Sequence, residues 1–427
     1  MRQRALCPVV LGLAAVTLAV TGCSSGTVTP SPTVAVTPVV TTSPSPTPTS
    51  TPAPTPTPTP RSSPTLAHGP VGFTATGNMT DFRDSDTATL LPDGRVLIAG
   101  GRNAWGSGKV DVLASAELYD PATGKFTATG SMAQARWTHT ATLLADGRVL
   151  IAGGRGTCTD KCALTDTAEL YDPATGTFSG TGSLPDGFFV EGAAALLDGH
   201  VLVTGFNTGT VAAELYDPAT GTWSPTGPLQ DSRLMYTVTS LRDGRVLVTG
   251  GYLGTFSGGQ MTSEKDLASA FLYDPTTGRW SATGSMLHAR ADAVATSLAD
   301  GRVLVVAGRT VTGSLTSSAE IYNPTTGRFT ATGSTGITRD IEATATLLLD
   351  GRVLFAGGDG AASPLSSAQI YNSTTGKFGG AKSLVNARFF QTATLLPDGR
   401  VLIAGGDDRD KVSGMPVSLN SAELYQP

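Results

Sequence analysis

The stretch TATLLPDGRVLIAGG at residues 87–101, followed by AELYDPATGKF at 116–126, decides the fold, because close variants of both recur along the chain. Asp-Gly pairs begin at seven positions, spaced 45 to 57 residues apart: Asp93, Asp146, Asp198, Asp243, Asp300, Asp350 and Asp398. Each unit holds four short segments of β type, and its Asp-Gly suits a tight hairpin turn because glycine readily adopts positive φ. Four strands per unit at this period predict an all-β propeller.

Aromatic residues recur at two positions of each unit. The third segment carries a tyrosine: Tyr119, Tyr171, Tyr216, Tyr273, Tyr322, Tyr371 and Tyr425. The fourth carries a phenylalanine or tryptophan: Phe73, Phe126, Phe178, Trp223, Trp280, Phe329 and Phe378. We expect both sets to form the core between neighbouring units, since large aromatic side chains bury the most apolar area.

The units resemble kelch repeats. The resemblance rests on the two aromatic positions and on a diglycine that ends the second segment, as in Gly100-Gly101 and Gly153-Gly154. It covers residues 71–427 and implies a seven-bladed propeller with four antiparallel strands per blade, similar to the central domain of galactose oxidase. Residues 72–77 form a fourth segment without a preceding third, and residues 422–425 form a third without a following fourth. We therefore expect the N-terminal strand to close the last blade and remove two open sheet edges.

The N-terminus predicts export. Residues 1–22 have a positive start and an apolar run too short to span a bilayer comfortably, which is typical of a signal peptide. The following Val20-Thr21-Gly22-Cys23 resembles the lipobox of bacterial lipoproteins, which implies lipidation of Cys23. An ordinary cleaved signal or a membrane helix is the alternative. We expect the lipid to anchor the protein to the bacterial cell envelope, at the outer face of the plasma membrane or at an outer membrane.

Residues 23–66 are rich in threonine, proline and serine and cannot build a core, so we expect a disordered linker. Residues 67–427 form the predicted propeller, a monomeric head. Only 15% of residues are charged and the formal net charge is −5, which argues against nucleic-acid binding.

The connections of such a propeller fall on two faces. The Asp-Gly turns and the turns after the third strand share one face and hardly vary. The connections between second and third strands lie on the other face and span 7 to 18 residues. Because function usually lies in variable loops on a rigid scaffold, we expect a ligand there, where the first strands begin at the mouth of the central channel.

The residues near those strand starts break the repeat pattern and include acids and aromatics. The predicted ligand-binding set is Asp84, Asp86, Trp137, His139, Glu191, Tyr236, Asp292, Glu342, Phe389 and Gln391, with Phe189 and Phe390 beside it. Glu342 enters this set because the sixth unit has an extra residue and Ala343 is the other occupant of its position. Carboxylates can accept hydrogen bonds from hydroxyl groups, and aromatic faces can pack on sugar C–H groups. The alternative is that these are exposed residues without a ligand.

Other recurrent polar residues receive structural or local interpretations. We expect six arginines before the first strands to bind backbone carbonyls or neighbouring acids rather than an anion: Arg83, Arg136, Arg233, Arg290, Arg339 and Arg388. Cys158 and Cys162 lie in one loop of an exported protein, which favours a local disulfide. No metal site and no cofactor are predicted, because the cysteines lack a matching histidine pair.

The sequence favours a surface-anchored, non-enzymatic binding module for a glycan or a protein ligand, because no catalytic set stands out. The alternative is a carbohydrate-active enzyme, similar to a sugar epimerase or mutarotase, with His139 and Glu191 as acid–base residues.

Overall fold

The structure is a computed structural model that describes residues 71–105, 110–158, 162–185, 188–207, 210–231, 233–257, 260–310, 312–339, 342–410 and 412–427. The predicted signal peptide, the predicted lipidation site Cys23 and the predicted linker to residue 66 lie outside the described residues. Within those ranges, no helix is long and apolar enough to cross a membrane.

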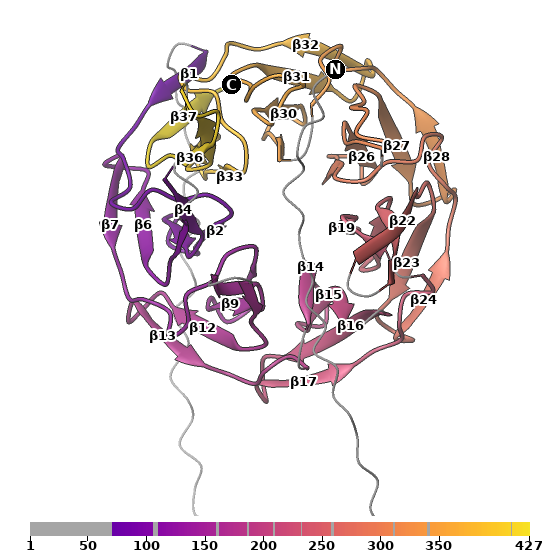
Figure 1. Cartoon of the computed structure of the whole chain (residues 1–427), viewed down its shortest axis with the longest axis horizontal. Coiled ribbons are helices and arrows are strands. Elements are labelled where there is room, and N and C mark those ends of the chain that lie inside the picture. Colours follow the sequence, from indigo (N-terminus) through magenta and orange to yellow (C-terminus); the bar gives the residue numbers. More distant parts are fainter. Residues whose placement is uncertain are drawn as a thin grey trace, which may run out of the picture. The chain divides into compact units, whose positions relative to one another are not determined.

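The described residues form seven four-stranded antiparallel sheets arranged in a ring (Figure 1). The innermost strands are β2 (Thr87–Leu90), β8 (Thr140–Leu143), β14 (Phe189–Ala195), β19 (Thr237–Ser240), β25 (Val294–Ser297), β29 (Thr344–Leu347) and β33 (Thr392–Leu395). Each contacts the innermost strand of both adjacent sheets, and β33 contacts β2. The chain is therefore all-β and propeller-like.

The second strands begin with buried apolar runs such as VLIA, since both of their faces pack against neighbouring sheets. They are β3 (Val96–Ala99), β9 (Val149–Ala152), β15 (Val201–Asn207), β20 (Val246–Thr249), β26 (Val303–Val306), β30 (Val353–Ala356) and β34 (Val401–Ala404). The third strands are β6 (Ala116–Asp120), β12 (Ala168–Asp172), β16 (Thr210–Asp217), β23 (Ala270–Asp274), β27 (Ala319–Asn323), β31 (Ala368–Asn372) and β37 (Ala422–Gln426).

The outermost strands are β7 (Lys125–Ala128), β13 (Thr177–Gly180), β17 (Thr222–Pro225), β24 (Arg279–Ala282), β28 (Arg328–Ala331), β32 (Lys377–Gly380) and β1 (Gly72–Ala75). The last of these comes from the opposite end of the described chain. β1 pairs with β37, and Phe73 lies opposite Tyr425 in the register. This is the pairing that the two incomplete end units predict.

The recurrent aromatics bind neighbouring sheets together. Each tyrosine stacks on the aromatic of the adjacent outer strand, as Tyr171 does on Phe178 with ring centroids 4.8 Å apart. The tyrosine hydroxyl also reaches the preceding sheet, where Tyr171 lies 2.9 Å from the Thr129 hydroxyl. The same contact joins Tyr119 to Thr76. These side chains are therefore part of the scaffold.

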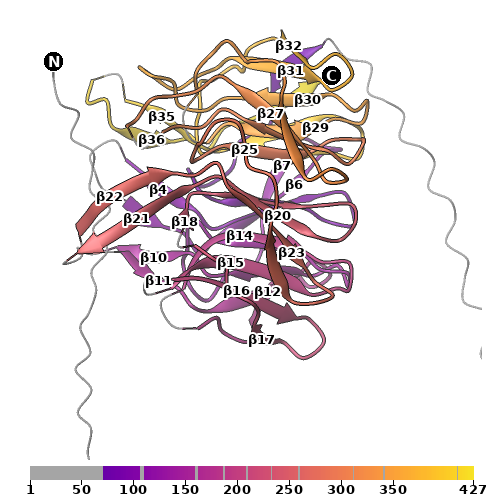
Figure 2. The ribbon, with the colours of Figure 1, turned by 90° about the vertical axis from the view of Figure 1, so that its right-hand side faces the viewer.

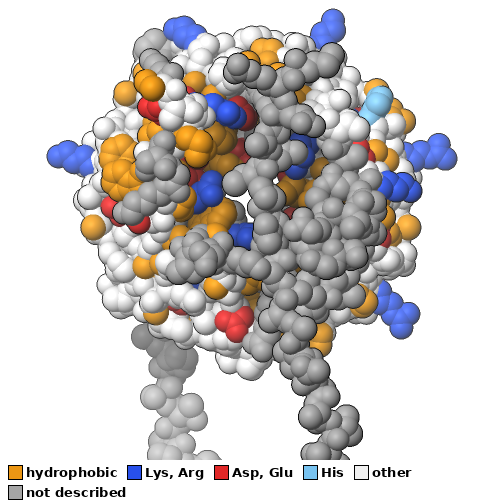
Figure 3. Space-filling model, in the orientation of Figure 1, with side chains coloured by type: hydrophobic (Ala, Val, Ile, Leu, Met, Phe, Trp, Pro, Cys, Tyr) orange, Lys and Arg blue, Asp and Glu red, His pale blue; other side chains and the backbone are white. Residues whose placement is uncertain are grey.

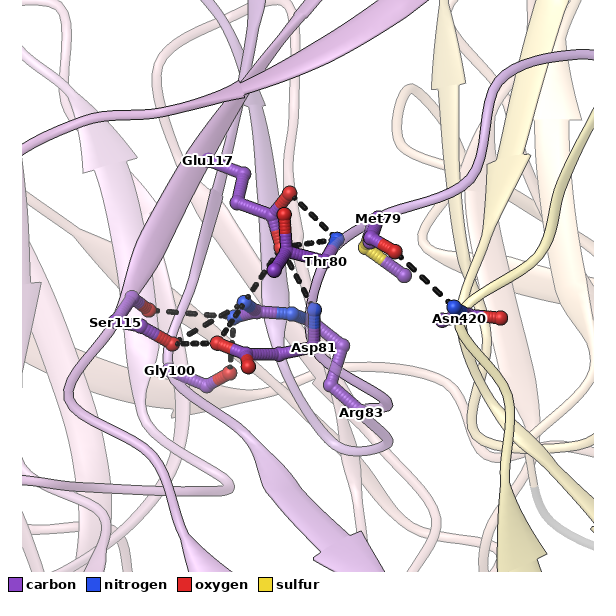
Figure 4. Close-up of polar contacts among 8 residues, drawn as sticks. All are labelled: Met79, Thr80, Asp81, Arg83, Gly100, Ser115, Glu117 and Asn420. Carbon is purple, nitrogen blue, oxygen red and sulfur yellow. Dashed lines mark hydrogen bonds and ion pairs between the residues drawn. The ribbon is translucent and has the colours of Figure 1, made fainter.

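The recurrent arginines are also structural, as Figure 4 shows for the first repeat. Arg83 is wholly buried and donates hydrogen bonds to the Gly100 carbonyl oxygen at 2.8 Å and to Glu117 at 3.1 Å. Glu117 in turn accepts from the backbone N–H of Thr80. One arginine thus fixes the chain entering a sheet to two strands of that sheet.

Additional hairpins extend from one side of the ring (Figure 2). They are β4 (Arg102–Ala104) with β5 (Val110–Val112), β10 (Arg155–Cys158) with β11 (Cys162–Leu164), β21 (Tyr252–Ser257) with β22 (Gln260–Asp266), and β35 (Asp407–Arg409) with β36 (Pro416–Ser418). The short β18 (Arg233–Leu234) pairs with β21. This is the face whose loops vary in the sequence, and it carries the candidate site.

Candidate functional site

The site lies around the opening at the centre of the hairpin face, where Figure 3 shows basic and apolar side chains together. Its first layer comes from the residue directly after the diglycine position. Arg155 occupies that position in the second sheet and exchanges two backbone hydrogen bonds of 2.9 Å with Trp137. Gly154 has φ of +95°, and a Cβ there would lie 2.7 Å from the Trp137 carbonyl oxygen. Only glycine therefore allows the two segments to approach this closely.

The residues at this position were not among those predicted from the sequence. They are Arg102, Arg155, Phe206, Tyr252, Arg309, Asp359 and Asp407. The available signal was a varied residue that directly follows an invariant glycine, on the face expected to bind ligand.

The second layer is a set of non-glycine residues with left-handed backbone: Ser85, Thr138, Met235, Asp292, Glu342 and Phe390. All six lie at equivalent positions of different sheets, two residues before the first strand. Backbone hydrogen bonds link neighbouring members, from Thr138 N–H to the Ser85 carbonyl and from Asp292 N–H to the Met235 carbonyl, each 3.0 Å. Such conformations cost about 1–3 kcal/mol each and cluster at functional sites.

Glu191 interrupts this second layer in the third sheet. Strand β14 has a register shift between Val190 and Gly192, so Glu191 is a bulge residue. Its carboxyl oxygen Oε2 accepts a 3.0 Å hydrogen bond from the Met235 N–H. The equivalent N–H groups of Thr138 and Asp292 donate to backbone carbonyl oxygens of the preceding sheet. At the bulge, the Glu191 carboxyl group takes the place of that carbonyl as the acceptor.

Burial raises the pKa of Glu191 to about 8, and the neighbouring Asp292 carboxylate acts in the same direction. The Met235 N–H and the Arg155 guanidinium oppose this shift of the pKa without overcoming it. Glu191 is half-buried, so a ligand at the mouth can still reach it. The arrangement supplies a carboxylic acid that keeps its proton at neutral pH and can transfer it.

Aromatic rings separate the basic side chains of the mouth. The Arg102 guanidinium lies 4.3 Å from the centre of the Trp137 ring, and that of Arg155 lies 5.7 Å from the same ring. Arg155 also lies 4.7 Å from the Phe189 ring. These cation–π contacts hold both guanidinium groups at the rim.

A buried carboxyl pair lies beneath this rim, where the first and last sheets meet. Asp84 and Asp407 are both fully buried. Asp84 accepts hydrogen bonds from Arg102 Nε and from the Ser418 hydroxyl, both 2.9 Å. Burial, and then the charge of Asp84, raise the pKa of Asp407. The pair therefore retains a proton well above the usual range of an aspartate.

Several predicted site residues are buried between sheets rather than open to a ligand. These are Asp84, Asp86, His139, Tyr236, Phe389 and Gln391. Burial raises the pKa of Asp86 to about 7 and raises that of Tyr236. The Gln391 amide donates to the Ala356 carbonyl at 3.0 Å. Trp137, Glu191, Asp292 and Glu342 are the half-buried members of the predicted set.

The predicted acid–base partners His139 and Glu191 belong to different places in the ring. His139 Nε2 lies 3.0 Å from the Thr87 hydroxyl, between the first two sheets, whereas Glu191 is bonded to the fourth sheet. Burial lowers the pKa of His139 to about 3, so its imidazole is neutral and a poor proton acceptor at neutral pH. The structure therefore does not bring this pair together.

Asp292 and Cys162 have local partners. Asp292 accepts a 2.7 Å hydrogen bond from Arg309 Nε. The hairpin β10–β11 places Cys158 opposite Cys162 in the register, and Cys162 is disulfide-bonded. The side chain of Cys158 is outside the described set.

No protein-family model matches this sequence, and the search of curated proteins finds no match. Among solved structures, the chain is similar to a structure described as a novel fungal alcohol oxidase with catalytic diversity among the AA5 family, in complex with copper. The identity is 16%, the TM-score is 0.63, and the match covers 84% of this chain and 77% of the other. The chain has a galactose-oxidase-like all-β fold. At this identity the likeness shows the fold alone.

The comparison corrects the functional prediction. The sequence favoured a non-enzymatic binding module, but a solved structure with this fold is described as an alcohol oxidase, so the comparison does not support the binding module. The enzymatic alternative is the better supported of the two.

The residues present do not fit a copper centre like that of the oxidase. Within the described ranges, no group of three or more His, Cys, Asp and Glu side chains could hold a metal ion. His139 is buried against Thr87, and His200 lies on an Asp-Gly turn beside Asp198. The fold is therefore shared with that oxidase, and the donor set is not.

Proposed function

We propose that this protein is an enzyme that transfers protons on a sugar at the channel mouth, in the manner of an epimerase or mutarotase. The single observation that carries this proposal is the position of Glu191. Its carboxyl group lies on a bulge at the rim, is half-buried, and has one oxygen bound to the Met235 N–H. Within the described residues, its other oxygen accepts no hydrogen bond and is available to a ligand.

The surroundings of Glu191 suit a sugar. Trp137 and Phe189 present aromatic rings beside Arg155, whose guanidinium is near the Glu191 carboxyl group, and such rings pack on the C–H faces of pyranoses. A hollow on the opposite face is lined by residues that most repeats supply, such as Asp300, Arg302 and Pro324. The channel mouth differs from this hollow because it carries residues that do not recur from repeat to repeat, such as Trp137 and Glu191.

The proposed chemistry begins with the proton of Glu191. Glu191 donates this proton to the ring oxygen of a hemiacetal sugar while the anomeric hydroxyl loses its proton to water, and the C–O bond of the ring breaks. The open-chain aldehyde then closes with its other face towards the ring hydroxyl, the proton of that hydroxyl returns to Glu191, and water returns a proton to the former carbonyl oxygen. A positioned acid of this kind contributes about 10²–10⁴-fold to a rate.

The test compares anomer exchange of sugars, followed by NMR, for the wild type and Glu191→Gln. The amide oxygen of Gln can still accept from Met235 N–H, so the fold is retained while the proton is lost. We expect a rate loss of at least about 100-fold. Asp93→Asn, on an exposed turn of the opposite face, is the matched control and should leave the rate unchanged. Equal rates for wild type and Glu191→Gln would reject Glu191 as the acid.

We further propose that the scaffold is a seven-bladed kelch-type propeller. Seven described four-stranded sheets, contacts between neighbouring inner strands and the pairing of β1 with β37 support this proposal. We also propose that the chain is exported and is anchored in the cell envelope by a lipid on Cys23.

Lipid attachment has a direct test. Cells fed a labelled fatty acid should incorporate the label into the wild-type chain, and the Cys23→Ala variant should carry none. Equal labelling of both chains would contradict anchoring through this cysteine.

A further inference from the structure

Arg155 forms no ion pair in the part of the chain that the structure describes. Its guanidinium packs against the rings of Trp137 and Phe189 and makes no hydrogen bond with a described residue. Burial lowers the pKa of Arg155, the nearby Glu191 carboxyl acts in the opposite direction, and the Arg102 charge lowers the pKa further. An arginine held at a rim with its donors open is poised for an anion.

The other mouth arginines show what Arg155 is missing. Arg102 is paired with Asp84 at 2.9 Å and Arg309 with Asp292 at 2.7 Å. Asp84 lies three residues before the first strand of its sheet, and Asp292 lies two residues before the first strand of its own. In the second sheet these positions hold Trp137 and Thr138, and neither carries a charge.

Arg102 adds a second positive charge to the same place. It uses Nε for Asp84, and its two terminal nitrogens make no hydrogen bond with a described residue. The Asp84 carboxylate also accepts from the hydroxyls of Ser85 and Ser418, so it is shared among three donors. The guanidinium groups of Arg102 and Arg155, both beside the Trp137 ring, are therefore matched by only one ion-paired carboxylate among the described residues, that of Asp84.

We propose that Arg155 and Arg102 form a subsite for the carboxylate of a sugar acid, placed beside Glu191. This inference rests on the proposed function and names its substrate class. A carboxylate matches the planar fork of a guanidinium and compensates the positive charge of Arg155. Trp137 lies between the two arginines and would contact the sugar ring.

The test measures binding rather than turnover, so it does not depend on the proposed chemistry. Calorimetric titration of the full-length protein compares glucuronate with glucose, which differ at one carboxylate. We expect glucuronate to bind about 10–100-fold more tightly, because charge-assisted hydrogen bonds contribute about 1.5–3 kcal/mol. The preference should weaken at high salt.

Arg155→Gln should lose most of this preference while its melting temperature is unchanged or raised, since the repulsion from Arg102 is removed. Arg95→Gln removes the same charge at an Asp-Gly turn of the opposite face and should keep the preference. Arg155→Lys should keep part of it, because the charge remains and the fork is lost.

Equal binding of glucuronate and glucose by the wild type, or an unchanged preference in Arg155→Gln, would overturn the subsite. Tighter binding of glucose 6-sulfate than of glucuronate would also overturn it, since the subsite would then serve a sulfate. Loss of turnover in Glu191→Gln with no preference for glucuronate would leave the proposed function standing and reject this subsite alone.

Discussion

At the residue scale, carboxyl groups near the channel mouth differ from those of the turns in their burial and in the direction of their pKa shift. The acids of the turns lie on the surface beside an arginine, as Asp93 does beside Arg95, and the pKa of Asp93 is lowered. Asp86 is buried instead, and neither of its oxygens has a hydrogen-bond partner in the described residues. Desolvation then dominates and raises the pKa of Asp86 to about 7.

This difference predicts a pH-dependent stability. Asp86 is protonated in the folded chain and ionised in the unfolded chain between pH of about 4 and about 7, so folding loses stability as the pH rises through this window. Asp86→Asn should remove the loss and stabilise the protein above pH 7 by about 4 kcal/mol, as judged from unfolding curves. Asp93→Asn should not. A variant Asp86→Asn that is less stable than wild type at high pH would contradict a protonated Asp86.

At the scale of single elements, a buried arginine fixes six of the seven described sheets to the chain segment that enters them. Arg136 donates to the carbonyl oxygens of Gly153 and Thr167 at 3.0 and 2.8 Å and to Glu169 at 2.8 Å. Arg136→Met should destabilise the protein by about 3–5 kcal/mol, because Glu169 is left buried without its partner.

The double variant Arg136→Met, Glu169→Met should recover much of that loss, measured by denaturant unfolding. The third sheet already works without the arginine, since Phe188 takes its place and burial raises the pKa of the corresponding Glu214. A single variant as stable as wild type would contradict the role assigned to Arg136.

The strands, the aromatic core and the structural arginines follow from the repeated sequence, because a residue that recurs in every unit meets the same neighbours every time. The site follows less well. Left-handed backbone at Met235 or Phe390 has no sequence signal, since glycine would be expected there. The bulge at Glu191 depends on the register of the sheet. Arg155 differs from Arg102 and Arg309 because no acid stands at the positions of Trp137 and Thr138.

At the scale of the whole molecule, the ring depends on β1, whose residues lie at the far end of the described chain from β37. Deleting residues 71–77 would leave the edge of β37 open and remove the Phe73 ring, 4.9 Å from that of Tyr425. The melting temperature should fall by many degrees and association should increase, as seen by calorimetry and light scattering. An unchanged melting temperature would contradict closure by this strand.

The central claim is that the mouth is an acid–base site, and anomer exchange of glucuronate as a function of pH tests it most directly. With full-length protein, kcat/KM should be steady below pH of about 8 and fall above it, as Glu191 loses its proton. Glu191→Gln should show no such fall and only a residual rate. An exchange rate no faster than that without protein, at any pH, would contradict the account.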